Sequence, residues 1–162
     1  MKKLISLSLD KIPLVQQLAR EIWEEHYTCI IGQSQIDYML NLFYSTQQIQ
    51  SEIEKGVFWE ILYWNDEAVG YLVCELQDEK LHLSKIYLKS KVQGKGLGKF
   101  LIQRAIEIAK LHQKKSIVLN VNKNNVNSIL FYEKNAFIKI DEGIFDIGNG
   151  FVMDDFIYER NV

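Results

Sequence analysis

The sequence has few of the residues that stabilise disulfide-rich, metal-binding or membrane-spanning proteins. Its 162 residues include two cysteines, Cys29 and Cys74, and three histidines that are scattered along the chain. This spacing argues against a zinc site, and nothing in it calls for a disulfide. No apolar run approaches the roughly 18 residues that cross a membrane. The single proline, Pro13, leaves no proline-rich linker between domains.

A charge excess of one sign is also missing. Lys and Arg number 19 against 21 Asp and Glu, so the net charge is -2 at pH 7. This balance gives no electrostatic reason to expect nucleic-acid binding. Hydrophobic residues make up 48% and charged residues 25%, as in ordinary globular proteins. The apolar segment at the N-terminus is too short for a secretion signal, and polar residues follow it. We therefore expect one domain over residues 1–162, in the cytoplasm, with no membrane partner.

The most informative segment runs from Ile86 to Lys99. An apolar stretch typical of a strand leads into three alternating glycines over residues 94–98, and an amphipathic helix pattern follows. Glycines let the backbone approach a ligand closely, and a helix N-terminus offers unpaired N–H groups and a positive dipole end. Lys95 and Lys99 add positive charge. The segment predicts a site for a phosphate or pyrophosphate; the alternative is a glycine-rich helix start that binds nothing.

Two familiar phosphate loops do not fit this segment. The P-loop requires Ser or Thr after Gly-Lys, and here Phe100 stands there. The dinucleotide fingerprint requires another glycine spacing and an acidic residue after the next strand, which instead ends in Asn122. The spacing that fits is Gln93-x-x-Gly96-x-Gly98. It resembles the acetyl-CoA pyrophosphate loop of the GNAT family of N-acetyltransferases, written Q/R-x-x-G-x-G/A.

A second segment strengthens this resemblance. Residues 125–137 are similar to the family pattern N-x-x-[AS]-x-x-x-Y-E-K-x-G-F, at the expected distance from the glycine loop. The resemblance extends over the whole chain in element order and is most specific over residues 81–137. One departure is Ala136, where the family usually has glycine, and this puts the geometry of the turn before Phe137 in question.

Hydrophobic periodicity gives the expected elements. Strands are expected at residues 4–8, 57–64, 68–76, 81–88, 116–121, 137–146 and 151–159. Helices are expected from about 12 to 28, from 34 to 43, at 97–109 and at 125–134, with a further short one at 46–54. The predicted order is β-α-α-β-β-β-α-β-α-β-β. The resemblance implies an α/β (α+β) acyl-CoA N-acyltransferase fold, with a mixed, mostly antiparallel sheet of about seven strands flanked by helices.

The resemblance also implies an acetyl-CoA site and no metal. The strands at 81–88 and 116–121 would separate, and the pantetheine arm would lie between them. The residues expected to contact acetyl-CoA are Ile86, Tyr87, Leu88, Gln93, Gly94, Lys95, Gly96, Leu97, Gly98, Lys99, Asn125, Ser128 and Lys134.

The resemblance assigns the catalytic roles as well. Tyr132 is the expected general acid, because a phenol with a pKa of about 10 can protonate a departing thiolate. His82 is the expected base, at an offset where the family's histone-type members have glutamate and its arylalkylamine-type members have histidine. The alternative is a histidine that only packs in the fold. Glu75 is a reserve candidate, and an amine that arrives neutral would need no base.

The acceptor would be selected by the N-terminal helices and the last hairpin. Candidates there are aromatic or acidic: Trp23, Glu24, Glu25, His26, Tyr27, Tyr38, Asp154 and Asp155, besides Glu75. Acids near aromatic rings suit a cationic amine, although such acids also occur on solvated helix faces. The N-terminal pattern is similar to the polyamine acetyltransferase branch, which favours a small-molecule amine.

Several alternative acceptors and functions stay open. The acceptor could instead be an amino acid, an aminoglycoside or a protein N-terminus or lysine. The same fold could also serve as a non-catalytic acyl-CoA-binding module. A nucleotide-binding regulator is disfavoured by the absent hydroxyl after Lys99. The chain could act as a monomer or as a homodimer.

Overall fold

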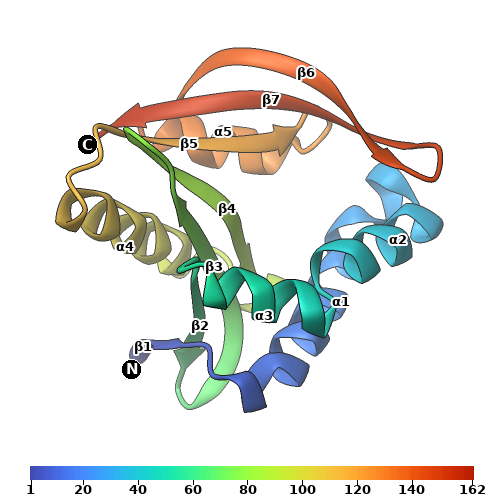
Figure 1. Ribbon diagram of the computed structural model, residues 1–162, viewed down its shortest axis with the longest axis horizontal. Helices are drawn as coiled ribbons and strands as arrows, with labels where there is room; N and C mark the ends of the chain where they lie inside the picture. The colour runs from blue at the N-terminus through green and yellow to red at the C-terminus, as the bar shows by residue number, and fades with distance from the viewer. The chain divides into compact units, whose positions relative to one another are not determined.

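A seven-stranded mixed sheet forms the centre of the fold. The computed structural model describes residues 1–162, and its strands lie in the order β1-β2-β3-β4-β5-β7-β6 (Figure 1). The pair β4–β5 is parallel, whereas β1–β2, β2–β3, β5–β7 and β6–β7 are antiparallel. This confirms the expected fold class.

Most elements lie within a few residues of their predicted positions. The strands are β1 Lys2–Ser6, β2 Phe58–Trp64, β3 Glu67–Leu76, β4 Lys80–Leu88, β5 Ser116–Asn122, β6 Ile138–Gly148 and β7 Phe151–Asn161. The α-helices are α1 Ile12–Ile31, α2 Gln33–Phe43, α3 Thr46–Glu54, α4 Leu97–Leu111 and α5 Val126–Lys134. Three helices therefore lie between β1 and β2, where the predicted order counted two.

Local chemistry explains where these helices begin and end. Pro13 lies in the first turn of α1, where its missing N–H is harmless. Helix α1 continues to Ile31 because nothing interrupts it before Gly32, whose φ of 80° separates it from α2. The Ser45 side chain accepts a hydrogen bond from Gln48 N and starts α3 as a separate helix. The helix expected to end near residue 28 therefore ends three residues later, at Ile31.

The chain divides into two compact units. The first unit comprises Met1–Glu75 with Lys85–Leu101, and the second comprises Leu76–Ser84 with Ile102–Val162. Strand β4 and helix α4 each contribute residues to both units. A single domain over residues 1–162 stays our proposal for this chain.

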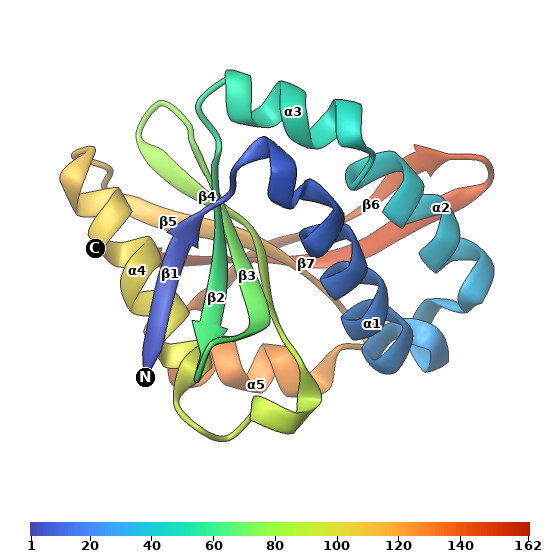
Figure 2. The same cartoon turned by 90° about the horizontal axis from the view of Figure 1, so that it is seen from below.

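In the first unit, β1, β2 and β3 form an antiparallel meander that α1–α3 accompany (Figure 2). Asn65 and Asp66, between β2 and β3, have φ values of 50° and 64°, as a two-residue hairpin turn requires. The core holds an aromatic cluster, defined here by the contacting rings of Trp23, Tyr27, Tyr44, Trp59, Tyr71 and Tyr87.

One glycine lets β3 approach the end of β4 closely. A Cβ added at Gly70 would overlap the carbonyl oxygen of Tyr87 and lie 2.8 Å from Cδ2 of Leu88. Next to it, Lys89 N donates a hydrogen bond of 2.9 Å to the carbonyl of Val69. Only glycine fits between these two strands at this position.

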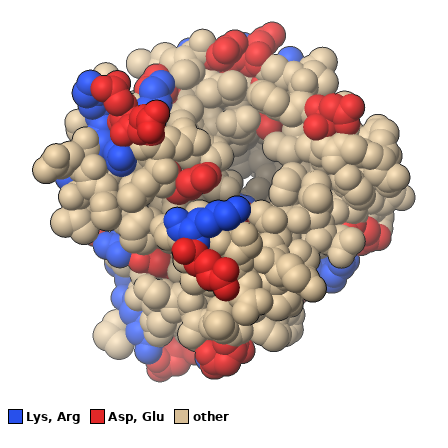
Figure 3. All heavy atoms as spheres, viewed as in Figure 1, with Lys and Arg blue, Asp and Glu red and all other residues tan.

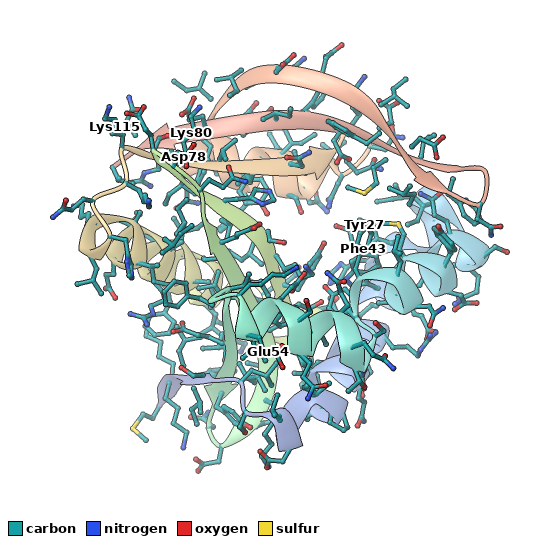
Figure 4. The ribbon with its side chains drawn as sticks, viewed as in Figure 1. Tyr27, Phe43, Glu54, Asp78, Lys80 and Lys115 are labelled. Atoms are coloured by element: carbon teal, nitrogen blue, oxygen red, sulfur yellow. The ribbon has the colours of Figure 1, made fainter.

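In the second unit, β5 lies between the first residues of β4 and the strand β7. The parallel register joins Lys80–His82 to Ser116–Val118, so β4 continues beyond its last paired residue. Figure 4 shows Lys80 and Lys115 at the same end of β4 and β5, as parallel pairing requires. The hairpin between β6 and β7 turns at residues 148–150, with positive φ at all three.

No helix is both long enough and apolar enough to cross a membrane. Acidic and basic side chains are interspersed on the face that Figure 3 displays, without a broad area of one sign. No group of His, Cys, Asp and Glu side chains has the arrangement of a metal site.

We predict that Gly70→Ala lowers the free energy of unfolding by about 2 kcal/mol or more, because the methyl group meets backbone atoms of β4 that cannot rotate away. Thermal unfolding measures this effect. Gly143→Ala is the matched control, since its Cβ would meet only the mobile ring of Phe145. Equal melting temperatures for the two variants would contradict the close approach.

Candidate active site

The glycine loop has the backbone geometry of an anion cradle. Gly94 and Gly96 adopt φ values of 74° and 76°, a conformation that side chains disfavour, and a Cβ at either would meet nothing within 4 Å. At the start of α4, Phe100 N donates a hydrogen bond of 3.1 Å to Gly96 O. The amides of residues 97–99 therefore come before the first hydrogen bond of the helix. This open, amide-rich surface fits a pyrophosphate.

Side chains next to the loop contact other parts of the first unit. The Lys95 ammonium lies 5.0 Å from the centre of the Trp64 ring. Gln93 Nε2 lies 3.3 Å from Nε2 of His26 on α1. Lys99 is exposed. The loop therefore offers an anion mainly backbone N–H groups, and the phosphate contacts expected of Lys95 and Lys99 stay predictions.

Two of the expected acceptor residues join the end of β4 in the aromatic cluster. The ring centres of Trp23 and Tyr27 lie 5.7 and 6.2 Å from that of Tyr87. The Tyr44 and Tyr71 hydroxyls lie 2.8 Å apart, and burial raises the pKa of both phenols. Burial thus keeps the Tyr44 and Tyr71 hydroxyls neutral, and the rings of Trp23 and Tyr27 lie beside Tyr87, which we expect at the cofactor.

The acids expected at the acceptor have different surroundings. Glu24 is exposed and forms an ion pair of 2.9 Å with Arg20, so it lies on the outer face of α1. Glu75 interacts electrostatically with Lys85, whose ammonium lies over the Tyr44 ring at 5.5 Å. Burial lowers the pKa of Lys85, and the nearby carboxylates Glu52 and Glu75 oppose this shift. Glu75 is therefore a partner for a half-buried cation already present in the chain.

His82 lies on one defined face of the sheet in the second unit. It pairs with Val118, which lies opposite Glu159 on β7. Lys80, two residues before His82 on β4, forms an ion pair of 3.0 Å with Glu159. Side chains two residues apart on a strand share a face. The histidine therefore faces the same side as the Lys80–Glu159 pair.

Asp155 lies on this same face, four residues before Glu159 on β7. It is only 4% exposed and pairs with Asn122 of β5. Burial raises the pKa of its carboxyl group, the Asp154 charge adds to this shift, and a hydrogen bond with Asn120 opposes it. We call His82, Asn120 and Asp155 the polar face of the second unit.

Helix α5 packs on the opposite side of these strands. Tyr158, whose side chain points away from the polar face, donates a hydrogen bond of 2.9 Å to Glu133. Arg160, on the same side of β7, donates to the carbonyl of Asn135 at 2.7 Å. The polar face and α5 therefore flank β5 and β7 from opposite sides.

Tyr132 is the one residue of α5 that is fully buried, at 8% exposure. Its ring packs against Phe131 and Phe137, with ring centres 5.5 and 5.7 Å away. Asn125 caps the helix by accepting a hydrogen bond of 3.3 Å from Ser128 N. This cap gives Asn125 and Ser128 a structural role, and their contacts with the cofactor stay predictions, as does that of Lys134.

The turn before Phe137 keeps its geometry without the glycine. Ala136 adopts φ of 66°, the left-handed conformation that glycine takes most readily at a helix end. Phe137 N donates a hydrogen bond of 3.1 Å to Tyr132 O, as in a regular helix C-cap. The substitution thus preserves the turn, with some backbone strain.

Comparisons with known proteins agree with this geometry. A profile of the acetyltransferase (GNAT) family matches residues 15–137. A spermidine N(1)-acetyltransferase from Thermoplasma acidophilum is 26% identical over 156 residues, which cover 91% of this chain and 92% of that protein. A peptidyl-lysine N-acetyltransferase, YjaB of Salmonella typhimurium, is 24% identical over 75% of this chain and 80% of its own length.

A crystal structure gives the same fold over the full chain. PaiA N-acetyltransferase from Thermoplasma acidophilum, in complex with coenzyme A, superposes with a TM-score of 0.87 at 24% identity. The match covers 100% of this chain and 99% of that one. The glycine loop, the family profile and this fold lead to one conclusion: the chain belongs to the GNAT family of acetyltransferases, enzymes that take their acetyl group from acetyl-CoA.

Proposed function

We propose that this enzyme acetylates a primary amine of a small molecule, with polyamines as the favoured class. The observation that carries this proposal is the polar face, where a buried carboxylate, Asp155, lies on the same side of the sheet as His82. A cationic amine beside Asp155 would favour the ionised carboxylate that burial disfavours. The similarity to a spermidine acetyltransferase over nine-tenths of the chain supports this acceptor class.

The two sides of the second unit divide the chemistry between them. Acetyl-CoA, when bound, supplies the acetyl group as a thioester. On the polar face, His82 would take the proton from the ammonium, directly or through water, so that the amine nitrogen can bond to the carbonyl carbon. On the other side, the Tyr132 hydroxyl would protonate the sulfur as the C–S bond breaks. The acylated nitrogen would then lose its second proton to the Tyr132 phenolate through solvent, and His82 would release its proton to water, so that the transfer balances without a metal.

The cofactor would be held in the first unit. Amides at the start of α4 would bind the pyrophosphate, and backbone groups of Ile86 and Leu88 would pair with the pantetheine amides. Each of these contacts comes from backbone atoms whose positions are fixed by the strand, the loop and the helix.

An acetyl-CoA turnover assay tests the function directly. Thiol release is followed with spermidine, spermine, amino acids, arylalkylamines, aminoglycosides and peptides with free amines. Turnover with polyamines supports the proposal, and turnover with peptides alone overturns the acceptor class. Coenzyme A binding without turnover of any amine would favour a non-catalytic acyl-CoA-binding module.

With the best amine of that assay, we predict that Tyr132→Phe lowers kcat by roughly 10²–10⁴-fold and leaves coenzyme A binding unchanged. Phenylalanine keeps the packing against Phe131 and Phe137 and removes only the acid. Tyr158→Phe is the matched control, because it also removes a hydroxyl beside α5 and should retain turnover. Full activity in Tyr132→Phe would exclude this tyrosine as the acid.

We predict that Gly98→Asp weakens coenzyme A binding at least about tenfold without lowering the melting temperature. Gly98 is the second residue of α4, where a carboxylate repels a phosphate but stabilises the helix dipole by about 0.3–1 kcal/mol. Calorimetry and thermal unfolding measure the two effects. Gly98→Asn has nearly the same shape without the charge, so the difference between the variants should shrink as salt rises. Equal affinities at low salt would refute the cradle.

We predict that Asp155→Asn stabilises the protein at pH 7 and raises KM for spermidine. Because burial raises the pKa of Asp155, the folded chain binds this proton more readily than the unfolded chain. The ionised group therefore destabilises the fold at pH 7, and the gain from Asn should shrink as the pH falls through the folded-state pKa.

Unfolding of the wild type and of Asp155→Asn at pH 7 and pH 5, with steady-state kinetics, measures both effects. Asp154→Asn is the control, since Asp154 pairs with Lys123 at 2.9 Å and should gain no stability on neutralisation. An unchanged KM for spermidine in Asp155→Asn would remove this carboxylate from the acceptor site.

A further inference from the structure

A histidine of α1 contacts the segment that connects β4 to the glycine loop. His26 Nε2 lies 3.4 Å from Leu88 O, 3.3 Å from Ser90 Oγ and 3.3 Å from Gln93 Nε2. Leu88 is the last residue of β4, Ser90 begins a short 3₁₀ helix, and Gln93 directly precedes the first glycine of the loop. The imidazole is half-buried. One ring nitrogen, 62 to 67 residues away in sequence, thus lies against both ends of this segment.

The three partners suit either tautomer of the imidazole. A protonated Nε2 can donate to the Leu88 carbonyl or to the Ser90 hydroxyl, and an unprotonated Nε2 can accept from Ser90 or from the Gln93 amide. The ring therefore keeps a hydrogen bond to this segment whichever nitrogen carries the proton. Such a contact serves to hold a position and does not require a change of charge.

Other residues of the first unit hold the same segment from either side of His26. Trp23 and Tyr27, on adjacent turns of α1, pack against Tyr87. One and a half turns before His26, Glu21 forms an ion pair of 3.1 Å with Lys89. The histidine is the one of these α1 residues that reaches Gln93, which lies closest to the loop.

The glycine loop depends on this attachment because it has little packing of its own. Nothing lies within 4 Å of the Cβ positions of Gly94 and Gly96, so their placement follows from the residues on either side. After the loop, helix α4 fixes the chain; before it, the segment from Leu88 to Gln93 must do so. An unanchored loop would have to be ordered when coenzyme A binds, which lowers affinity.

We propose that His26 is a positioning residue for acetyl-CoA binding, which holds the segment from Leu88 to Gln93 so that the glycine loop is in place before the cofactor arrives. The proposal rests on the proposed function. It moves His26, which we expected to help select the acceptor, to the cofactor side of the reaction.

The test uses the full chain and coenzyme A as the probe. We expect His26→Leu to weaken coenzyme A binding about tenfold, the loss of roughly one net hydrogen bond. His26→Gln should recover most of the affinity, because a Gln amide can both donate and accept near the position of Nε2. Cys29→Leu, at an exposed position one turn later on α1, is the control and should bind like the wild type.

Steady-state kinetics supply a second readout. In His26→Leu, KM for acetyl-CoA should rise by a similar factor and kcat at saturating acetyl-CoA should change by less than roughly twofold, because binding and not chemistry is affected. A fall in kcat at unchanged KM would overturn the positioning role, since it would place His26 in the chemical step.

The remaining outcomes separate this proposal from the function on which it rests. Absence of coenzyme A binding in the wild type overturns both. Wild-type binding with equal affinity in His26→Leu, or with His26→Gln as weak as His26→Leu, overturns the role of His26 alone. If His26→Leu does not fold, Ser90→Ala tests the same link from the opposite side: a several-fold loss of affinity supports the proposal and unchanged affinity overturns it.

Discussion

Strand β4 has different neighbouring strands along its length, and the proposed site depends on this change of neighbour. Its first three residues pair in parallel with β5. Its last residues lie against β3, where Gly70 permits close approach and Lys89 N donates to Val69 O. Backbone groups must find partners wherever they are buried. The strand therefore carries His82 in its first part, and in its second part Ile86 and Leu88, which we propose for the cofactor, directly before the glycine loop.

Burial disfavours the charged form of two polar groups, Asp155 and Lys85. Asp155 is a carboxylate buried on a sheet face, and Lys85 is a cation held under aromatic rings of the core. Burial shifts the pKa of each toward its neutral form, upward for the acid and downward for the amine. Such groups are expected where function requires them, because a purely apolar core would be more stable. Asp155 is the stronger candidate for a functional role, because the charge of Lys85 is already balanced by Glu52 and Glu75 nearby.

Sequence patterns predicted the features that depend on local chemistry. Helix α3 has its predicted bounds, Thr46–Glu54. The turns at residues 65–66 and 148–150, which join predicted strands, have the positive φ values that Asn, Asp and Gly tolerate. The features that escaped prediction depend on distant residues. Gly70 is an isolated glycine in a strand, and the residues around it in sequence do not indicate that Tyr87 lies opposite. The contacts of His26 with Ser90 and Gln93 likewise arise only in the folded chain. At Ala136 the departure from the family's usual glycine put the turn in question, and only the structure shows that alanine adopts the left-handed conformation there.

The two halves of the proposed site differ in what they demand of the sequence. The cofactor half is built from backbone atoms: two glycines with positive φ, the amides at the start of α4 and the edge of β4. Many sequences can supply these, which is consistent with one fold at 24% identity and a TM-score of 0.87. The acceptor half is proposed from individual side chains on the polar face. A few substitutions there can change the acceptor while the cofactor half is preserved. Relatives of this chain accordingly carry names as different as spermidine and peptidyl-lysine acetyltransferase, and we propose that side chains such as Asp155, more than the fold, decide between such acceptors.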